Sequence, residues 1–378
     1  MARLDELGKI ITGNTPKTSD ALNYSSNDIC FVKPSDILDG EITLLTDSEF
    51  YISNHARDKA RVLPPKSVLV TCIGIIGKVA INNVECAFNQ QINAIVPDTS
   101  KCLTEYLAYA IQNKQKEMQD IANAPVVPIL NKTQFSEIEI ELPSIESQTK
   151  VVAKMRAIDD LISLRKQQLS KLEELVKSRF IEMFGDPESN PYGHPTKKLS
   201  DIASYWNGLT YKPEDVQDQG TIVLRSSNIQ NSQLDFEDTV RVTCKIREKQ
   251  YVQNNDILMC SRNGSAKLVG KVALITNISE PMSFGAFMMI IRSDYYRYLM
   301  TYFQMDAFRN QIKTGATTTI NQITGNMLNQ VILPVPDLSV VSQFATFVEQ
   351  IDKSKFEIQK SLEKLEILKK ALMQQYFG

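Results

Sequence analysis

Histidine is scarce in this chain, with only His55 and His194 among 378 residues. Six cysteines are scattered without a C-x-x-C pair, mostly in apolar, strand-like runs, so we expect reduced, buried thiols. Zinc sites and acid–base pairs draw heavily on these two residue types. Their short supply argues against a zinc centre and against histidine-based catalysis, and we expect no metal.

Long apolar runs are missing as well. No stretch approaches the ~20 residues that a helix needs to cross a bilayer, and the first residues lack the basic-then-apolar pattern of a signal peptide. With 43% hydrophobic and 23% charged residues, the composition is ordinary for a soluble protein. We therefore expect a soluble, cytoplasmic protein with no membrane partner. A length of 378 residues suits two domains and an additional element.

A strong positive charge is the third absence, since 42 Lys and Arg stand against 44 Asp and Glu. Residues 1–148 contain 13 basic and 19 acidic residues, a net charge of −6, whereas residues 187–342 contain 15 and 14. A basic face is the usual electrostatic mark of a nucleic-acid-binding protein. Any surface that binds an anion must therefore be local.

Motifs of catalysis are also lacking. The pairs Gly77-Lys78 and Gly270-Lys271 have neither the spacing of a P-loop nor the Ser or Thr that would hold magnesium. The stretch NPYGHP (190–195) lacks the second proline of the methyltransferase motif N-P-P-Y and follows no glycine-rich cofactor loop. We expect no catalytic residues and no cofactor.

What the sequence does contain is a repeat of about half its length. Residues 158–185 and 351–378 match at 10 of 28 positions at an offset of 193, and the same offset aligns IGKVAI (76–81) with VGKVAL (269–274). Leu4 and Gly13 correspond to Leu199 and Gly208. A solenoid would need a period of 20–50 residues, so we infer a duplicated domain.

Each half has the same order of predicted elements: a β-rich globular part, a proline and one long helix. Segments 67–81 and 256–275 are β-branched runs bounded by turn residues. We divide the chain into a first globular domain (1–148), a first helical region (149–185), a linker (186–198), a second globular domain (199–340) and a second helical region (341–378).

The two helical regions carry a heptad pattern. From Val151 and from Phe344, apolar residues recur at alternating steps of four and three over five heptads, which is typical of a coiled coil. We call these positions the seam. Eight of its ten positions in each helix are apolar. We expect the contact between the helices to be formed by Val151, Met155, Ile158, Ile162, Leu169, Leu172, Val176, Phe344, Val348, Ile351, Ile358, Leu362, Leu365 and Leu372.

The seam has two interpretations. Each helix could lie on its own domain, but ~36 residues at ~1.5 Å each make a helix of about 54 Å, longer than such a domain can cover. We therefore favour pairing of the two helices. A parallel pair would crowd both domains at one end, so we predict an α/β (α+β) chain with two similar β-rich globular domains separated by a long antiparallel coiled coil, with an approximate twofold axis.

In this doubled order the sequence resembles the specificity (S) subunit of type I restriction–modification enzymes. The resemblance is carried by SRNGSAKLVGKVAL (261–274) with its partner at 71–81, by LP (142–143) and its counterpart at 335–336, and by the helix endings MFGDP (183–187) and YFG (376–378). It covers essentially the whole chain, and the doubled order of these motifs carries it rather than any single one.

The resemblance implies two target recognition domains, each reading one half of a bipartite sequence in double-stranded DNA. It implies that the coiled coil fixes the half-site spacing and docks two methyltransferase (modification) subunits per chain. It further implies no catalytic activity of the chain's own, and leaves room for restriction (nuclease or translocase) subunits. A coiled-coil interaction scaffold without a role on DNA stays open as the alternative, although it would not explain two divergent, polar-looped domains.

Polar side chains at predicted loop tips are the candidates for DNA contact, because such groups bind base edges and phosphates. Ordinary turn chemistry is the competing explanation for each of them. In the first half they are Asn14, Thr15, Lys17, Lys33, Ser35, Asp36, Asn89, Gln90 and Gln91. In the second half they are Tyr211, Lys212, Arg225, Ser226, Ser227, Asn228, Arg262, Asn263, Ser265, Thr317, Thr318, Thr319, Asn321 and Gln322.

Overall fold

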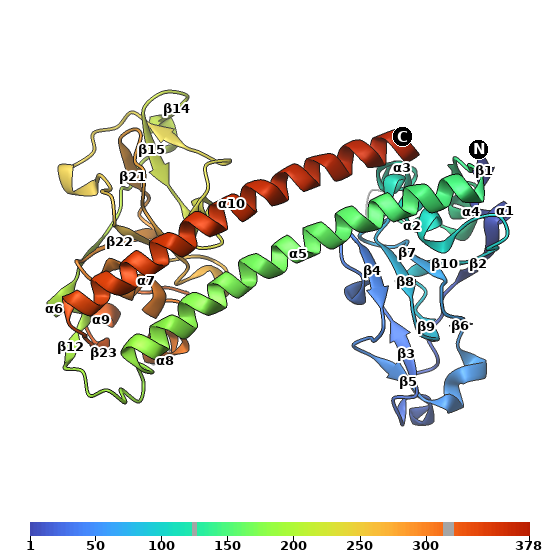
Figure 1. The fold of residues 1–378 in the computed structure, drawn as a ribbon, viewed down its shortest axis with the longest axis horizontal. Coiled ribbons are helices and arrows are strands. Elements are labelled where there is room, and N and C mark those ends of the chain that lie inside the picture. Colours follow the sequence, from blue (N-terminus) through green and yellow to red (C-terminus); the bar gives the residue numbers. More distant parts are fainter. Residues whose placement is uncertain (123–126, 313–320) are drawn as a thin grey trace. The chain divides into compact units, whose positions relative to one another are not determined.

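The structure, a computed structural model, describes residues 1–122, 127–312 and 321–378. It divides into two units. Unit 1 comprises Met1–Lys166 and Lys360–Gly378, and unit 2 comprises Gln167–Gln359. Two 40-residue helices, α5 (Ile145–Phe184) and α10 (Leu338–Phe377), each supply one segment to each unit (Figure 1).

Unit 1 is built on two sheets. The first has the strand order β2 (Gly8–Thr12), β10 (Ile92–Pro97), β7 (Val68–Thr71), β8 (Val79–Asn82), β4 (Ile42–Leu45). The second has the order β5 (Tyr51–Ile52), β3 (Ile29–Val32), β9 (Cys86–Phe88), β6 (Val62–Leu63). The remaining strands β1 (Ala2–Arg3) and β11 (Glu139–Ile140) pair with each other, and the helices before α5 are α1 (Leu4–Leu7), α2 (Thr104–Asn113), α3 (Gln115–Ile121) and α4 (Lys132–Ser136).

Unit 2 contains two four-stranded sheets. Their orders are β13 (Ser204–Asn207), β22 (Met288–Arg292), β19 (Ile257–Cys260), β20 (Val272–Leu274), and β14 (Val216–Gln217), β18 (Arg241–Val242), β15 (Thr221–Leu224), β21 (Met282–Phe284). Two strand pairs complete it: β12 (Thr196–Lys198) with β23 (Ile332–Pro334), and β16 (Ile229–Gln230) with β17 (Gln233–Leu234). Its short helices are α6 (Leu199–Ile202), α7 (Tyr296–Tyr302), α8 (Asp306–Ile312) and α9 (Gly325–Leu328).

The duplication inferred from the sequence is visible in the strand pairing. The order β2-β10-β7-β8 in unit 1 has its counterpart in β13-β22-β19-β20 in unit 2, and the parallel pair β3·β9 has its counterpart in β15·β21. Gly13 and Gly208 occupy matching close approaches. A Cβ built on either would lie 2.0 Å from a backbone oxygen, that of Asn89 or that of Phe284. Only glycine fits there.

Within unit 2, aromatic side chains join the two long helices. The ring of Phe344 on α10 lies 5.7 Å from that of Phe180 and 5.3 Å from that of Phe184, both on α5. Tyr298 of α7 stacks on Phe180 at 4.9 Å. Because Phe344 and Phe180 are completely buried, this aromatic group is a main part of the hydrophobic core of unit 2.

The helix segments run antiparallel in both units. In unit 1, Lys369 pairs with Asp159 at 2.7 Å, and Lys154 donates to the Tyr376 hydroxyl at 2.9 Å. Higher numbers on α10 thus meet lower numbers on α5. The order is the same in unit 2, because Lys355 pairs with Glu173 at 2.9 Å while the earlier Phe344 packs against the later Phe180 and Phe184.

Each apolar seam position is buried or half-buried. The buried members are Val151, Met155, Ile158, Ile162, Phe344, Val348, Ile351 and Leu362. The half-buried members are Leu169, Leu172, Val176, Ile358, Leu365 and Leu372. The heptad pattern therefore marks the inward face of each helix, as amphipathic packing requires.

The element boundaries differ from those expected. Helix α5 begins at Ile145 and α10 at Leu338, four and three residues before the predicted starts at 149 and 341. Ser144 precedes the first helix, and its hydroxyl accepts the amide of Ser147 at 3.3 Å. Asp337 precedes the second, so both helices start after typical N-cap residues. The expected linker 186–198 also ends in strand β12, at Thr196–Lys198.

All six cysteines lie within the described residues and are free thiols. Cys30 and Cys244 are half-buried, and the other four are buried. Burial raises the pKa of Cys72, Cys86 and Cys102 to about 12. Because the thiolate is the reactive form, these side chains act as small apolar residues of the core.

Candidate functional site

Several loops of unit 2 that hold the candidate DNA-contact residues lie at one end of its two sheets. Asn207 at the end of β13 pairs with Met289 near the start of β22, and Cys260 at the end of β19 pairs with Met288. In the other sheet Leu224 at the end of β15 pairs with Phe284. The segments 208–212, 225–228, 261–265 and 285–287 therefore all begin or end at this edge.

Side chains and backbone groups hold these loops against one another. The Asn263 side-chain amide donates to the Ser226 hydroxyl at 3.2 Å, and that of Asn321 donates to the Gly264 carbonyl at 3.2 Å. The guanidinium of Arg262 lies 5.3 Å from the ring of Phe287, which is 59% exposed. We call the group Ser226, Arg262, Asn263, Phe287 and Asn321 the loop cluster of unit 2.

Some predicted contact residues shape the loops instead. Asn228 is fully buried, and its side chain accepts the amide of Arg225 at 2.8 Å and donates to the carbonyls of Asp235 and Asp238 at 2.8 and 2.9 Å. Arg225 forms an ion pair with Asp238 at 2.7 Å. Tyr211 packs against the apolar group around Leu209. The turn explanation accounts for these positions.

The other candidates of unit 2 lie at or beside the cluster. Gln322 forms a backbone bridge with Arg262, the Ser227 carbonyl accepts from Gln230 at 3.1 Å, and the Ser265 amide donates to Asn263 at 2.9 Å. Lys212 is exposed and pairs with Glu214 at 3.2 Å. Thr317, Thr318 and Thr319 lie outside the described residues.

Unit 1 presents the matching edge. Thr12 pairs with Asn93 and Thr71 with Ile92, so the loops after β2 and β7 and before β10 lie together. There the Thr15 hydroxyl donates to the exposed Gln90 side chain at 2.7 Å.

Asn14 joins this edge to a neighbouring segment. Its side chain donates to the Lys59 carbonyl at 2.8 Å and accepts the Arg61 amide at 2.8 Å. Asn14, Thr15, Gln90 and Gln91 form the loop cluster of unit 1.

Three of the unit 1 candidates are committed to local geometry. The Asp36 carboxylate accepts the amides of Lys33 and Glu49 at 2.7 and 2.9 Å. Asn89 is buried and bonded to Gln91. The Lys33 ammonium lies 3.0 Å from the centre of the Phe50 ring. Ser35 is exposed beside them.

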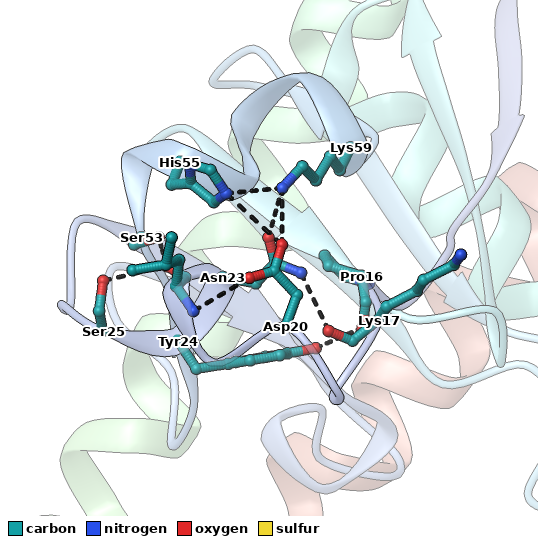
Figure 2. Close-up of polar contacts among 10 residues, drawn as sticks. Pro16, Lys17, Asp20, Asn23, Tyr24, Ser25, Ser53, His55 and Lys59 are labelled. Atoms are coloured by element: carbon teal, nitrogen blue, oxygen red, sulfur yellow. Dashed lines mark hydrogen bonds and ion pairs between the residues drawn. The ribbon is translucent and has the colours of Figure 1, made fainter.

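A group of basic side chains borders this edge, and the sequence reasoning missed most of it. Figure 2 shows Lys59 donating to Asp20 at 2.9 Å and to Asn23 at 3.1 Å, with His55 and Lys59 2.7 Å apart. The hydrogen bond from Lys59 lowers the pKa of Asp20 below its ordinary value. The Lys17 backbone carbonyl accepts from the Asn23 side chain at 2.9 Å. The Lys17 side chain is exposed beside this group (Figure 2).

The glycine-lysine pairs have a structural role in both units. Gly77 and Gly270 both adopt a φ of 84°. The following Lys78 donates to the Ile37 carbonyl at 2.8 Å, and Lys271 donates to the Ile229 carbonyl at 2.9 Å. Each lysine thus joins the turn before β8 or β20 to the segment that follows β3 or β15, so its ammonium group is engaged in the fold.

The edges offer amides, hydroxyls and a guanidinium, which are groups that bind base edges and phosphates. Within residues 1–122, 127–312 and 321–378, no set of three His, Cys, Asp or Glu side chains is arranged to hold a metal ion. In the same part of the chain, no helix is long and apolar enough to cross a membrane.

The chain is similar to known proteins along most of its length. The family model described as type I restriction modification DNA specificity domain matches residues 1–174 and again residues 193–369. The double match agrees with the internal duplication and confirms the resemblance seen in the sequence.

Two curated relatives are similar over part of the chain. The MjaIX specificity subunit of Methanocaldococcus jannaschii is 29% identical in an alignment of 227 residues that covers 54% of this chain and 52% of the relative. The HindI specificity subunit of Haemophilus influenzae is 32% identical in an alignment of 189 residues that covers 48% of this chain and 40% of the relative. The chain thus spans about half the length of the curated relatives it matches.

Two solved structures share the fold along the whole chain. The type I restriction–modification S subunit from M. genitalium superposes with a TM-score of 0.59 at 12% identity, covering 100% of this chain and 95% of that one. A chain from a structure of type I R-M complex assembly and conformational transition gives 0.55 at 17% identity, with 100% and 96% covered. These likenesses confirm the predicted fold class.

Proposed function

Since the chain belongs to the family of type I restriction modification DNA specificity domains, we propose that it gives a type I restriction–modification complex its DNA sequence specificity. The observation that carries this proposal is the doubled loop cluster. The same strand ends in both units present polar loops, and their side chains differ. Two similar scaffolds with different loops suit a target with two different halves.

In this proposal each unit binds one half of a bipartite site in double-stranded DNA. Direct base contact comes from exposed side chains at these loops, such as Gln90 in unit 1 and Arg262 in unit 2. The paired helices set the half-site spacing. The chain itself is non-catalytic and needs no cofactor, and it acts in the cytoplasm beside the DNA.

Methyltransferase subunits dock on the paired helices, two per chain, and restriction subunits can join the same assembly. Exposed apolar side chains on these helices support the docking proposal: Leu161, Leu164, Ile367 and Leu368 in unit 1, and Leu175, Ile181 and Phe356 in unit 2. Exposed apolar groups of this kind mark protein–protein contacts.

Co-expression with a type I methyltransferase subunit tests the proposed function. A stable complex that methylates adenine at one DNA sequence is expected. Co-purification without any sequence-specific methylation would favour the coiled-coil scaffold instead.

The docking proposal predicts the effect of charges on the helix surface. The double variant Leu164→Glu and Ile367→Glu is expected to weaken methyltransferase binding at least about tenfold, because each change places a carboxylate in an apolar contact. Both side chains are exposed, at 48% and 67%, so the fold should persist. Gln375→Glu, which adds a carboxylate at another exposed position of α10, is the matched control. Unchanged binding of the double variant, measured by titration calorimetry, would contradict the docking site.

The charge distribution predicts how the isolated chain binds DNA. Residues 1–148 have a net charge of −6, and basic groups at the unit 1 edge are paired within the chain, such as Lys59 with Asp20 and Arg57 with Glu85. We infer that the partner subunits supply much of the phosphate contact. The logarithm of the affinity of the isolated chain should fall against log salt with a slope shallower than about −3, since each phosphate contact contributes about −0.9. Tight binding with a steep slope would contradict this.

A further inference from the structure

Two residues in equivalent places of the two units have opposite chemistry. In unit 1 a single antiparallel bridge joins Ile73 to Ile129, and in unit 2 the corresponding bridge joins Arg262 to Gln322. The flanking backbone bonds match as well. The Cys72 amide donates to the Gln91 carbonyl at 2.8 Å, and the Ser261 amide donates to the Phe287 carbonyl at 2.9 Å.

The next backbone bond along each bridge repeats too. The amide of Leu130 donates to the Cys72 carbonyl at 2.9 Å, and that of Ile323 donates to the Ser261 carbonyl at 2.7 Å. Ile73 therefore stands where unit 2 has Arg262, and Ile129 stands where it has Gln322.

The unit 1 side of this comparison is apolar and exposed. Ile75 is 56% exposed, Ile129 50% and Val127 45%, and Ile73 is half-buried beside them. Single exposed apolar residues are common and need no explanation. Here, however, they gather on two segments at the edge of unit 1 that corresponds to the loop-cluster edge of unit 2, and the exposed amide of Gln90 lies at this edge of unit 1.

The unit 2 side presents a guanidinium. Arg262 is exposed, and the Phe287 ring beneath it at 5.3 Å holds the side chain over an aromatic face. Asn263 and Asn321 are bonded to neighbouring loops and fix the segment that carries it. A guanidinium supported in this way is suited to paired hydrogen bonds.

The major groove gives these two surfaces different partners. Among the four bases only thymine carries a methyl group there, whereas guanine offers two acceptors, O6 and N7, that match an arginine. Resting on the proposed function, we propose that Ile73, Ile75 and Ile129 contact thymine methyl groups in the half-site bound by unit 1, and that Arg262 donates to guanine O6 and N7 in the half-site bound by unit 2.

Base analogues test this in the complete complex with its methyltransferase subunits, on DNA carrying the sequence that the complex methylates. Deoxyuridine in place of thymidine removes only the methyl group, and 7-deazaguanine removes only N7. In one half-site we expect uracil to lower the methylation kcat/KM about fourfold per contacted methyl. In the other, 7-deazaguanine should lower it about tenfold or more.

Variants assign each effect to its residue. The Ile75→Ser and Ile129→Ser variants should each respond less to uracil than the parent while keeping their response to 7-deazaguanine, and Arg262→Ala should show the reverse. Leu44→Ser is the matched control, because Leu44 is 62% exposed on β4, the edge strand of its sheet, and takes no part in the bridge. It should keep both responses. Thermal melting checks that each variant is folded.

Three results would overturn the inference. One is indifference of the parent complex to uracil in both half-sites. Another is a target whose two halves lack the required A·T and G·C pairs. The third is loss of methyltransferase binding by Ile75→Ser, which would make the apolar surface a subunit contact. A complex that methylates no specific sequence would instead contradict the proposed function.

Discussion

Replacing Phe344 by alanine is expected to lower the free energy of unfolding of unit 2 by about 3–5 kcal/mol, the usual cost of truncating a buried phenylalanine. The side chain is fully buried and meets the rings of Phe180 and Phe184 at 5.7 and 5.3 Å. Because these rings come from the other long helix, the cavity would open at the joint between the two helices.

Urea unfolding followed by tryptophan fluorescence measures this loss, because Trp206, which lies in unit 2, is the single tryptophan of the chain. Phe356→Ala is the control. It removes the same side chain from the same helix at a position that is 65% exposed, and should change stability by no more than about 0.5 kcal/mol. Equal, small losses from both variants would show that the helices are not joined by this core.

Replacing Gly208 by alanine is expected to cost about 3 kcal/mol and to abolish recognition of the half-site bound by unit 2. The new Cβ would lie 2.0 Å from the Phe284 oxygen and 2.5 Å from the Gly285 oxygen. Both atoms belong to the backbone, so no side chain can swing aside. The strand end would have to shift, and with it the loops that form the cluster of unit 2.

Gly264→Ala is the matched control for this change. Gly264 belongs to the same edge of unit 2, but a Cβ built there has no atom within 4 Å beyond its own residue and its two chain neighbours. Its unfolding midpoint and its methylated sequence should match those of the parent chain. A Gly208→Ala variant with the parent's midpoint and the parent's target would refute the role given to this close approach.

The heptad pattern could be interpreted from the sequence because it is local. Residues three and four positions apart lie on the same face of a helix, so the spacing of the apolar seam residues shows which face is inward. The buried positions of both helices follow this spacing. The helix starts were misplaced for lack of a cap assignment. Ser144 and Asp337 each follow a proline and precede the first turn, a signal that the apolar series alone does not contain.

The candidate site was harder, because a loop residue's role depends on distant partners. Strand ends and the repeat sufficed to name residues of loops such as 225–228 and 261–265 as candidates for DNA contact. They could not show that the Asn228 side-chain amide donates to the carbonyls of Asp235 and Asp238 and is therefore engaged within the fold. Nor could they single out Phe287, whose ring supports Arg262 and which has no partner of its own type in the first half.

The central claim is that each unit binds one half of a divided DNA target. Sequencing the modified bases of a host whose only adenine methyltransferase is the complex containing this chain tests it most directly. We predict one motif in two short defined parts separated by a fixed, undefined gap, with substitution of Arg262 altering one part and not the other. A continuous motif, or a change in both parts from that substitution, would contradict the claim.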